Sequence, residues 1–199
     1  SFDWKPEQKN EGLKTAGQVQ YVARCGNFRE AGYEYTGTLR ILKVIMSYDY
    51  LWMNIRVKGG AYGCMNIFRR NGDTSFVSYR DPNLEETVAV FERAADYVAD
   101  FKADERTMDQ YVIGAVSDMD TPLTPRAKGE ISLSAWFSGI TEEMLQKERD
   151  QVLQAQQEDI RSLSGLVKAV MDQGNLCVVG SETAVEKNAG LFEQVESLL

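Results

Sequence analysis

The stretch YLWMNIRVKGGAYG, residues 50–63, decides the fold of this chain. An apolar, aromatic segment with helical spacing leads to Arg56 and then to the pair Gly59 and Gly60. A glycine pair ends a helix because glycine tolerates the left-handed backbone of a helix C-terminus. Tyr62 follows at once, so a guanidinium and a phenol are expected to lie close together beside unobstructed main chain. Such a place is suited to holding another peptide.

Elements on both sides of this stretch can be predicted from spacing and turn residues. Apolar residues at helical intervals predict a helix over 39–57, with Thr38 as its N-cap. Its inward stripe comprises Leu42, Ile45, Met46, Leu51 and Ile55. Strands are predicted at 61–69 and 74–80, because Asn71-Gly72-Asp73 between them is a hairpin turn signal.

The rest of the chain is predicted to be mostly helical. Polar–apolar alternation predicts a strand over 18–24, and an apolar run predicts a buried central strand over 176–180. Residues 1–17 are interpreted as a polar lead-in and 119–129 as a Pro-containing loop. Helices are predicted over 82–101 (started by Asp81-Pro82), over 104–118, around Trp136 and Phe137, over 141–173, and in short pieces within 182–199.

This order of elements predicts the fold class. Strands and helices are partly segregated along the chain, which indicates an α+β two-layer sandwich. We expect one mainly antiparallel sheet with helices packed on one face. No linker or internal repeat divides the 199 residues, so a single domain covering 1–199 is expected.

Composition excludes several classes of function. The net charge of −8 makes nucleic acid an unfavourable partner. The chain contains no histidine, so it can form neither a His-based triad nor an HExxH zinc helix. Cys25, Cys64 and Cys177 form no CxxC pair, which favours buried free thiols and a reducing, cytoplasmic compartment. No segment reaches the ~18 apolar residues of a membrane span, so no membrane partner is expected.

Longer motifs extend the central stretch over nearly the whole chain. They are GYEYTG, YLWMNIRVKGGAYGC, FVSYRDP, TPLTPRAKG, WFSGITEEM and LCVVGSE, in that order. In this arrangement the chain resembles the C-terminal region of the pitrilysin/insulinase family of zinc metallopeptidases, and most of all its presequence-protease-like group. The R-x-x-G-G-A-Y-G core is the most specific part of the resemblance.

The resemblance implies a fold, a cofactor and partners. The fold is that of the LuxS/mitochondrial-processing-peptidase-like metallohydrolases, and such enzymes close two halves around a chamber. Their N-terminal half holds zinc on an inverted HxxEH helix, whereas the last domain bears no metal and lends an Arg and a Tyr to the bound peptide. Arg56 and Tyr62 match those two positions. Without histidine this chain is expected to be that last domain, partnered by the zinc-bearing half and by unstructured peptide substrates.

The chemistry of the pair agrees with this role. A neutral tyrosine hydroxyl can donate to the oxyanion that develops at a scissile carbonyl, and an arginine can bind substrate carbonyls. Gly59 and Gly60 would let the substrate main chain approach. The alternatives are that Arg56 serves the helix end and Tyr62 the core, and that the chain is a non-catalytic scaffold subunit or a stand-alone peptide-binding module.

Several neighbours of the pair are interpreted as structural rather than functional. Lys58 and Asn54 are expected to be solvated or to support the helix, and the aromatic residues Tyr48, Tyr50 and Trp52 to belong to the core. Tyr79, Arg80 and Asp81 are interpreted as a local ion pair and helix cap. The acidic segment EEMLQKERDQ, residues 142–151, is interpreted as a solvated helix face.

Overall fold

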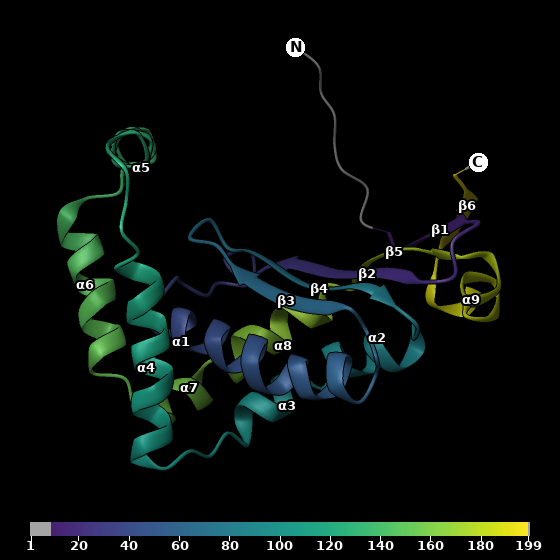
Figure 1. Cartoon of the computed structure of the whole chain (residues 1–199), viewed down its shortest axis with the longest axis horizontal. Coiled ribbons are helices and arrows are strands. Elements are labelled where there is room, and N and C mark those ends of the chain that lie inside the picture. Colours follow the sequence, from purple (N-terminus) through teal and green to yellow (C-terminus); the bar gives the residue numbers. More distant parts are fainter. Residues whose placement is uncertain (1–8, 199) are drawn as a thin grey trace.

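A six-stranded sheet, ordered β3-β4-β2-β5-β1-β6, forms one layer of the protein, and helices cover one of its faces (Figure 1). The computed structural model describes residues 9–198. The strands are β1 Glu11–Thr15, β2 Gln20–Asn27, β3 Gly63–Phe68, β4 Asp73–Asp81, β5 Asn175–Ser181 and β6 Gln194–Ser197. The pairs β3–β4, β4–β2 and β2–β5 are antiparallel, whereas β5–β1 and β1–β6 are parallel. The predicted α+β sandwich with a mainly antiparallel sheet is therefore confirmed.

The register of the strands separates a buried face from an open one. Successive residues of a strand point to opposite faces, so residues aligned across strands share a face. One aligned row is buried, and it comprises Asn66, Phe76, Arg24 and Leu176. The adjacent row comprises Met65, Val77, Ala23 and Cys177, of which Met65 is 42% exposed. The first row packs on the helices, and the second lines the open face.

The helical layer contains elements from the middle and the end of the chain. The elements are α1 Thr38–Ile45, η1 Met46–Tyr50, η2 Trp52–Val57, α2 Glu85–Glu92, α3 Ala94–Ala99, α4 Glu105–Met119, α5 Pro125–Phe137, α6 Glu142–Leu153, α7 Gln157–Ser162, α8 Ser164–Asp172, α9 Glu182–Lys187 and η3 Ala189–Leu191. Helices α4 and α6 stand together at one end of the sheet, and α5 lies apart from the other helices (Figure 1). No helix within residues 9–198 is long and apolar enough to cross a membrane.

The helix predicted over 39–57 is present, and all five residues of its inward stripe are buried. Its hydrogen bonding changes after the first two turns. The N–H of Leu51 donates to the carbonyl of Met46, and that of Lys58 donates to Met53, five residues back in each case. This is π-helical bonding, which is rare and often lies at functional sites. The spacing of apolar residues predicted a helix here but not its type.

Two of the helices predicted from apolar spacing are divided into shorter helices in the structure. The helix predicted over 82–101 separates into α2 and α3 at Arg93. The helix predicted over 141–173 separates into α6, α7 and α8, because Gln156 and Asp159 form a capping box that starts a new helix. Helix α5 begins at Pro125, inside the predicted loop, where Thr124 caps it. Thr38 is not an N-cap but the first helical residue, with Gly37 in the cap position.

Two strands were missed by the sequence analysis. Strand β1 lies inside the predicted lead-in, of which residues 1–8 fall outside the described part of the chain. Gly12 allows β1 to pass the ring of Phe192, because a Cβ there would lie 2.9 Å from the ring. Strand β6 replaces part of the short helices predicted at the C-terminal end. Both strands are too short and polar to show alternation in the sequence.

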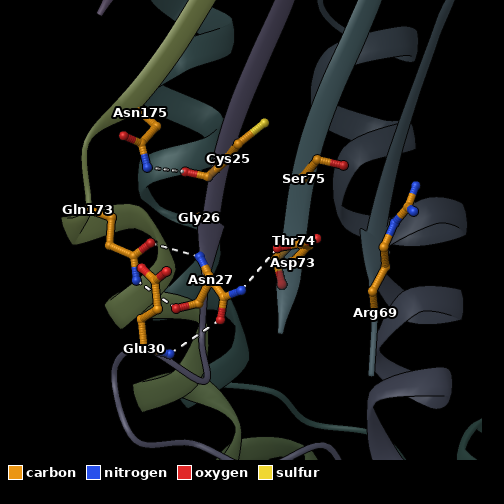
Figure 2. Close-up of a pocket in the computed structure, with 10 residues that line it drawn as sticks. All are labelled: Cys25, Gly26, Asn27, Glu30, Arg69, Asp73, Thr74, Ser75, Gln173 and Asn175. Atoms are coloured by element: carbon orange, nitrogen blue, oxygen red, sulfur yellow. Dashed lines mark hydrogen bonds between the residues drawn. The ribbon is translucent and has the colours of Figure 1, made fainter. Parts of the chain in front are cut away.

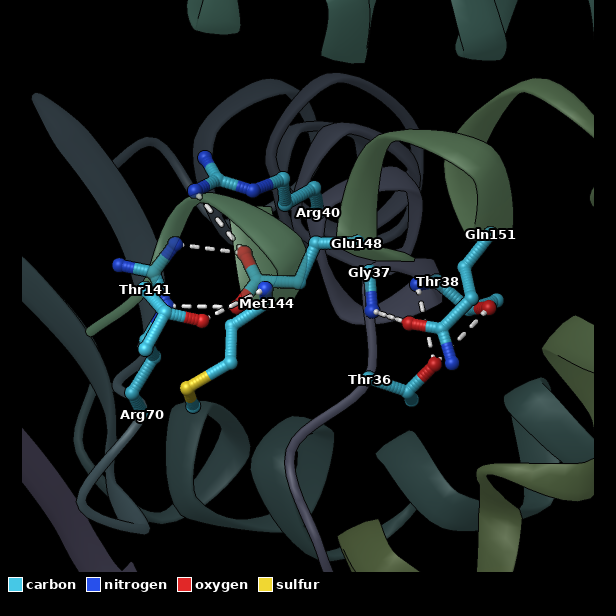
Figure 3. Close-up of polar contacts among 9 residues, drawn as sticks. All are labelled: Thr36, Gly37, Thr38, Arg40, Arg70, Thr141, Met144, Glu148 and Gln151. Atoms are coloured by element: carbon cyan, nitrogen blue, oxygen red, sulfur yellow. Dashed lines mark hydrogen bonds and ion pairs between the residues drawn. The ribbon is translucent and has the colours of Figure 1, made fainter. Parts of the chain in front are cut away.

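A buried carboxylate ties α6 to the body of the protein (Figure 3). Arg70 donates to both oxygens of Glu148, at 2.6 and 2.5 Å, and a nitrogen of Arg40 lies 3.6 Å from the same carboxylate. The hydrogen bond to Glu148 raises the pKa of Arg70. One turn later, Gln151 accepts the N–H of Gly37 at 2.8 Å, at the start of α1. The segment interpreted as a solvated face therefore contains a buried structural contact.

Replacing Glu148 by alanine should destabilise the protein strongly. The substitution leaves two partly buried guanidinium groups without their shared partner, which should lower the free energy of unfolding by about 2–3 kcal/mol. Urea unfolding of the 199-residue chain measures the loss. The control is Glu142→Ala, which removes the same charge from the exposed first turn of α6 and should cost less than about 0.5 kcal/mol. Equal losses in the two variants would contradict the structural role of Glu148.

Candidate functional site

Arg56, at the end of η2, and Tyr62, just before β3, are brought together by the turn between them. The Nη1 group of Arg56 donates to the carbonyl oxygen of Tyr62. The guanidinium carbon lies 4.5 Å from the ring centroid of Trp52 and 5.8 Å from that of Tyr62. Contact with two aromatic rings restrains a side chain that is otherwise flexible. The predicted proximity of guanidinium and phenol is therefore present.

Tyr62 presents its ring to solvent. The residue is 59% exposed, and its ring makes an edge contact with Tyr79 at 5.6 Å between centroids. Its N–H donates to the carbonyl of Arg80 at 3.2 Å, which fixes the backbone beside β4. The Tyr62 hydroxyl has no hydrogen-bond partner within residues 9–198, so this group is available to a ligand.

The two glycines of the turn have different environments. Gly60 has a φ of 81°, in the left-handed region, and its N–H donates to the carbonyl of Arg56 at 2.9 Å. A Cβ on Gly59 would lie 2.5 Å from the carbonyl oxygen of Ile55, so glycine is required there by close packing. The carbonyl of Gly59 accepts a hydrogen bond from Asn83 at 2.6 Å. Gly60 faces the site, whereas Gly59 holds the end of the helix.

An open hollow of about 430 Å³ adjoins the pair. Its lining consists of Val19, Arg56, Gly60, Ala61, Tyr62 and Arg80. Three of the four residues predicted for the site, Arg56, Gly60 and Tyr62, thus share one surface. Because the hollow is open and Tyr62 is exposed, this arrangement favours contact with a ligand over a role in the core.

Arg80 belongs to this site although the sequence analysis interpreted it as structural. The predicted ion pair with Asp81 does not form: the carboxylate of Asp81 is buried and accepts from the N–H of Asn83 at 2.9 Å and the hydroxyl of Thr87 at 2.7 Å. The guanidinium carbon of Arg80 instead lies 5.4 Å from the ring centroid of Tyr62. An irregularity in β4 turns Arg80 toward the hollow, and no motif in the sequence indicates it.

Other residues near the pair are structural or exposed. Tyr50 is buried, donates to the carbonyl of Val90 at 2.7 Å, and has its pKa raised to about 12 by burial. Asn54 donates to the carbonyl of Tyr50 and accepts from Lys58, which confirms their supporting role. Two aromatic residues expected in the core are exposed instead, namely Tyr48 at 75% and Trp52 at 40%.

A second hollow, of about 490 Å³, lies at the opposite ends of β2 and β4 (Figure 2). The amide of Gln173 accepts from the N–H of Asn27 and donates to its carbonyl, both at 2.7 Å. Asn175 donates to the carbonyl of Cys25 at 3.3 Å. Burial raises the pKa of the Cys25 thiol, which keeps it neutral and unreactive. Because these groups hold the strand ends together, we assign the candidate site to the hollow beside Tyr62.

The three cysteines are free, as predicted, but they are half-buried rather than buried. Burial raises the pKa of all three thiols, that of Cys64 to about 11. No group of three or more His, Cys, Asp or Glu side chains within residues 9–198 is arranged to hold a metal ion. In this part of the chain the side chains therefore do not fit a zinc site.

Comparison with known proteins identifies the family. Residues 10–183 match the family described as the PreP C-terminal domain. The chain belongs to this family. It is 42% identical over 198 residues to protein HypA of Clostridium perfringens, covering 100% of this chain and 20% of that protein. It is 31% identical over 203 residues to presequence protease 1 of Arabidopsis thaliana, covering 100% of this chain and 19% of that protein.

This PreP C-terminal domain spans about a fifth of the length of these curated relatives. Its fold is shared with pitrilysin, at a TM-score of 0.57 and 15% identity over 86% of this chain and 19% of that one. It is also shared with a peptidase M16 inactive domain from Pseudomonas fluorescens, at a TM-score of 0.60 and 13% identity over 91% of this chain and 46% of that one. The family match confirms the predicted resemblance to the presequence-protease-like group, and the shared fold agrees with the wider resemblance to pitrilysin.

Alanine at position 60 should destabilise this PreP C-terminal domain. A side chain in the left-handed region costs about 1–2 kcal/mol, and the new Cβ would gain only an ordinary van der Waals contact with Pro82 at 3.7 Å. The control is Gly129→Ala in the exposed helix α5, where no atom lies within 4 Å of the new Cβ and stability should rise by up to about 1 kcal/mol. Thermal unfolding of both variants measures the difference. A stable Gly60→Ala variant would show that the turn does not need glycine.

Proposed function

We propose that this domain is the metal-free, substrate-contacting C-terminal domain of a zinc metalloendopeptidase that degrades unstructured oligopeptides. In this proposal Arg56 and Tyr62 reach the bound peptide from the side opposite a zinc ion held by the N-terminal half of the same polypeptide. The observation that carries the proposal is their pairing at one open hollow, with the Tyr62 hydroxyl unengaged within residues 9–198.

Each residue has a distinct task in this proposal. Zinc, when bound in the other half, polarises the scissile carbonyl and activates water. The Tyr62 hydroxyl donates a hydrogen bond to the oxyanion that develops in the transition state. Arg56 uses Nη1 to hold the Tyr62 main chain, and its remaining N–H groups are free to bind carbonyl oxygens of the substrate. Gly60 presents bare main chain beside them, so an extended peptide can approach closely.

Helix α5 supports a further part of the proposal, contact with the zinc-bearing half. None of its residues is buried, although several are large and apolar. The exposed ones are Ile131 at 53%, Leu133 at 57%, Trp136 at 75% and Phe137 at 74%. An apolar helix that lies apart from the body is typical of a surface covered by another part of an assembly. We propose that the rest of the longer polypeptide covers it.

The isolated 199-residue chain should bind no stoichiometric zinc and hydrolyse no oligopeptide. It contains no histidine, and its acidic and thiol groups do not converge on a common point within residues 9–198. Metal analysis after dialysis against zinc, together with a peptide hydrolysis assay, tests both statements. The positive control is the full-length peptidase at the same concentration. One zinc per isolated chain, or turnover above the buffer rate, would contradict the proposal that zinc binding and hydrolysis need the N-terminal half.

Tyr62→Phe in the full-length peptidase should lower kcat by roughly 10²–10³ with a much smaller change in KM. The substitution removes only the hydroxyl, so the ring contacts with Tyr79 and both arginines remain. Steady-state hydrolysis of an unstructured peptide measures the effect. The control is Tyr48→Phe, which removes the same atom from an exposed tyrosine outside the hollow. Unchanged kcat in Tyr62→Phe would favour the scaffold alternative, because a chamber wall does not need this hydroxyl.

A further inference from the structure

Arg80 occupies a backbone position at which a side chain is unfavourable. Strand β4 has one extra residue there, so that Tyr79 and Arg80 together lie opposite Tyr21 of β2. The φ of Arg80 is 49°, and it is the one non-glycine residue with positive φ within residues 9–198. Glycine suits such a bulge position much better than arginine. Strain of this kind persists where the side chain is needed, which makes its surroundings informative.

The bulge aims Arg80 at the hollow beside Tyr62. Its guanidinium carbon lies 5.4 Å from the Tyr62 ring centroid, and that of Arg56 lies 5.8 Å from the same centroid. Arg80 is exposed, and both arginines line the hollow. Both guanidinium groups thus lie beside the Tyr62 ring and line the same hollow.

Neither arginine is neutralised by a carboxylate in the described part of the chain. Within residues 9–198 no carboxylate lies within ion-pair distance of Arg56 or Arg80, although the whole chain carries a net charge of −8. Both cations line the same hollow, so an anion that enters it is attracted by two positive charges at once. Although the domain has a net negative charge, this hollow is therefore positively charged and suited to binding an anion.

We propose that Arg56 and Arg80 bind a carboxylate of the substrate peptide, and that Arg80 thereby selects which peptides enter the site. This inference rests on the proposed function. Guanidinium groups bind carboxylates with paired, charge-assisted hydrogen bonds, and Arg56 has donors to spare beyond the one it gives to Tyr62. The carboxylate comes either from the C-terminus of the peptide or from an Asp or Glu side chain.

The test compares matched peptides in the full-length peptidase. One pair differs only in a free or amidated C-terminus, and a second pair differs only in Glu or Gln at one position. The unmodified enzyme should prefer the carboxylate form of at least one pair by about tenfold in kcat/KM, as expected for a charged hydrogen-bonded contact. Which pair shows the preference identifies the source of the carboxylate. Arg80→Gly should abolish the preference, and Arg80→Lys should retain part of it.

The control for charge is Arg69→Ala, which removes an exposed arginine at the other hollow and should leave the preference intact. A structural role is tested by thermal unfolding of the 199-residue chain. Arg80→Gly should leave Tm unchanged or raise it by roughly 2 °C, because glycine relieves the backbone strain. A lower Tm would show that Arg80 stabilises the fold instead.

Two results would overturn the inference. One is the absence of any carboxylate preference in the unmodified enzyme. The other is an equal loss of kcat/KM for carboxylate and amide peptides in Arg80→Gly, which would mean that Arg80 only orients Tyr62 or pairs with the other half. Tyr62→Phe separates this inference from the proposed function, since it should lower kcat for every peptide and leave the preference unchanged.

Discussion

The turn at Gly59 and Gly60 is the constraint on which the site depends. A long helix has to end at the edge of the sheet, and its last carbonyls need partners. The left-handed Gly60 lets the chain reverse while its N–H still bonds to Arg56. The reversal places Tyr62 beside β4, where its N–H continues the hydrogen bonding of the sheet to Arg80. Arg56, Tyr62 and Arg80 therefore converge because one backbone turn joins a helix end, a strand start and a bulge.

Much of the fold follows from periodicity, and the exceptions have identifiable causes. The stripe from Leu42 to Ile55 is buried, because apolar residues at helical spacing face the core in either helix type. The π-helical hydrogen bonding could not be predicted from the sequence. Helices bonded to the fourth or to the fifth preceding residue can both bury such a stripe. Short polar strands such as β1 lack alternation, and its pairing depends on long-range contacts with β5 and β6. Glu148 was misinterpreted because its partner Arg70 lies 78 residues away.

The site shows the same division between local and long-range signals. Arg56, Gly60 and Tyr62 lie within seven positions of sequence, so the turn chemistry of that stretch was enough to predict their proximity. Arg80 enters the hollow only because β4 pairs with β2 in a register that leaves one residue over. Register is set by the whole sheet, and it cannot be read from the segment FVSYRDP alone. The net charge of the chain did not predict the charge of the hollow either, because an acidic chain can still place unpaired arginines at one site.

The two left-handed backbone positions of the site act on the same residue, Tyr62. Gly60 and Arg80 both have left-handed backbones, and the hydrogen bond from Tyr62 to Arg80 lies between them. A shift in either turn would move Tyr62, its ring contact with Tyr79 and the stacked Arg56 together. A rigid arrangement of this kind suits a group that must meet a transition state, since a preorganised donor needs no rearrangement when charge develops. The same rigidity explains how the exposed Tyr62 and Arg80 and the half-buried Arg56 can keep a defined geometry at the surface.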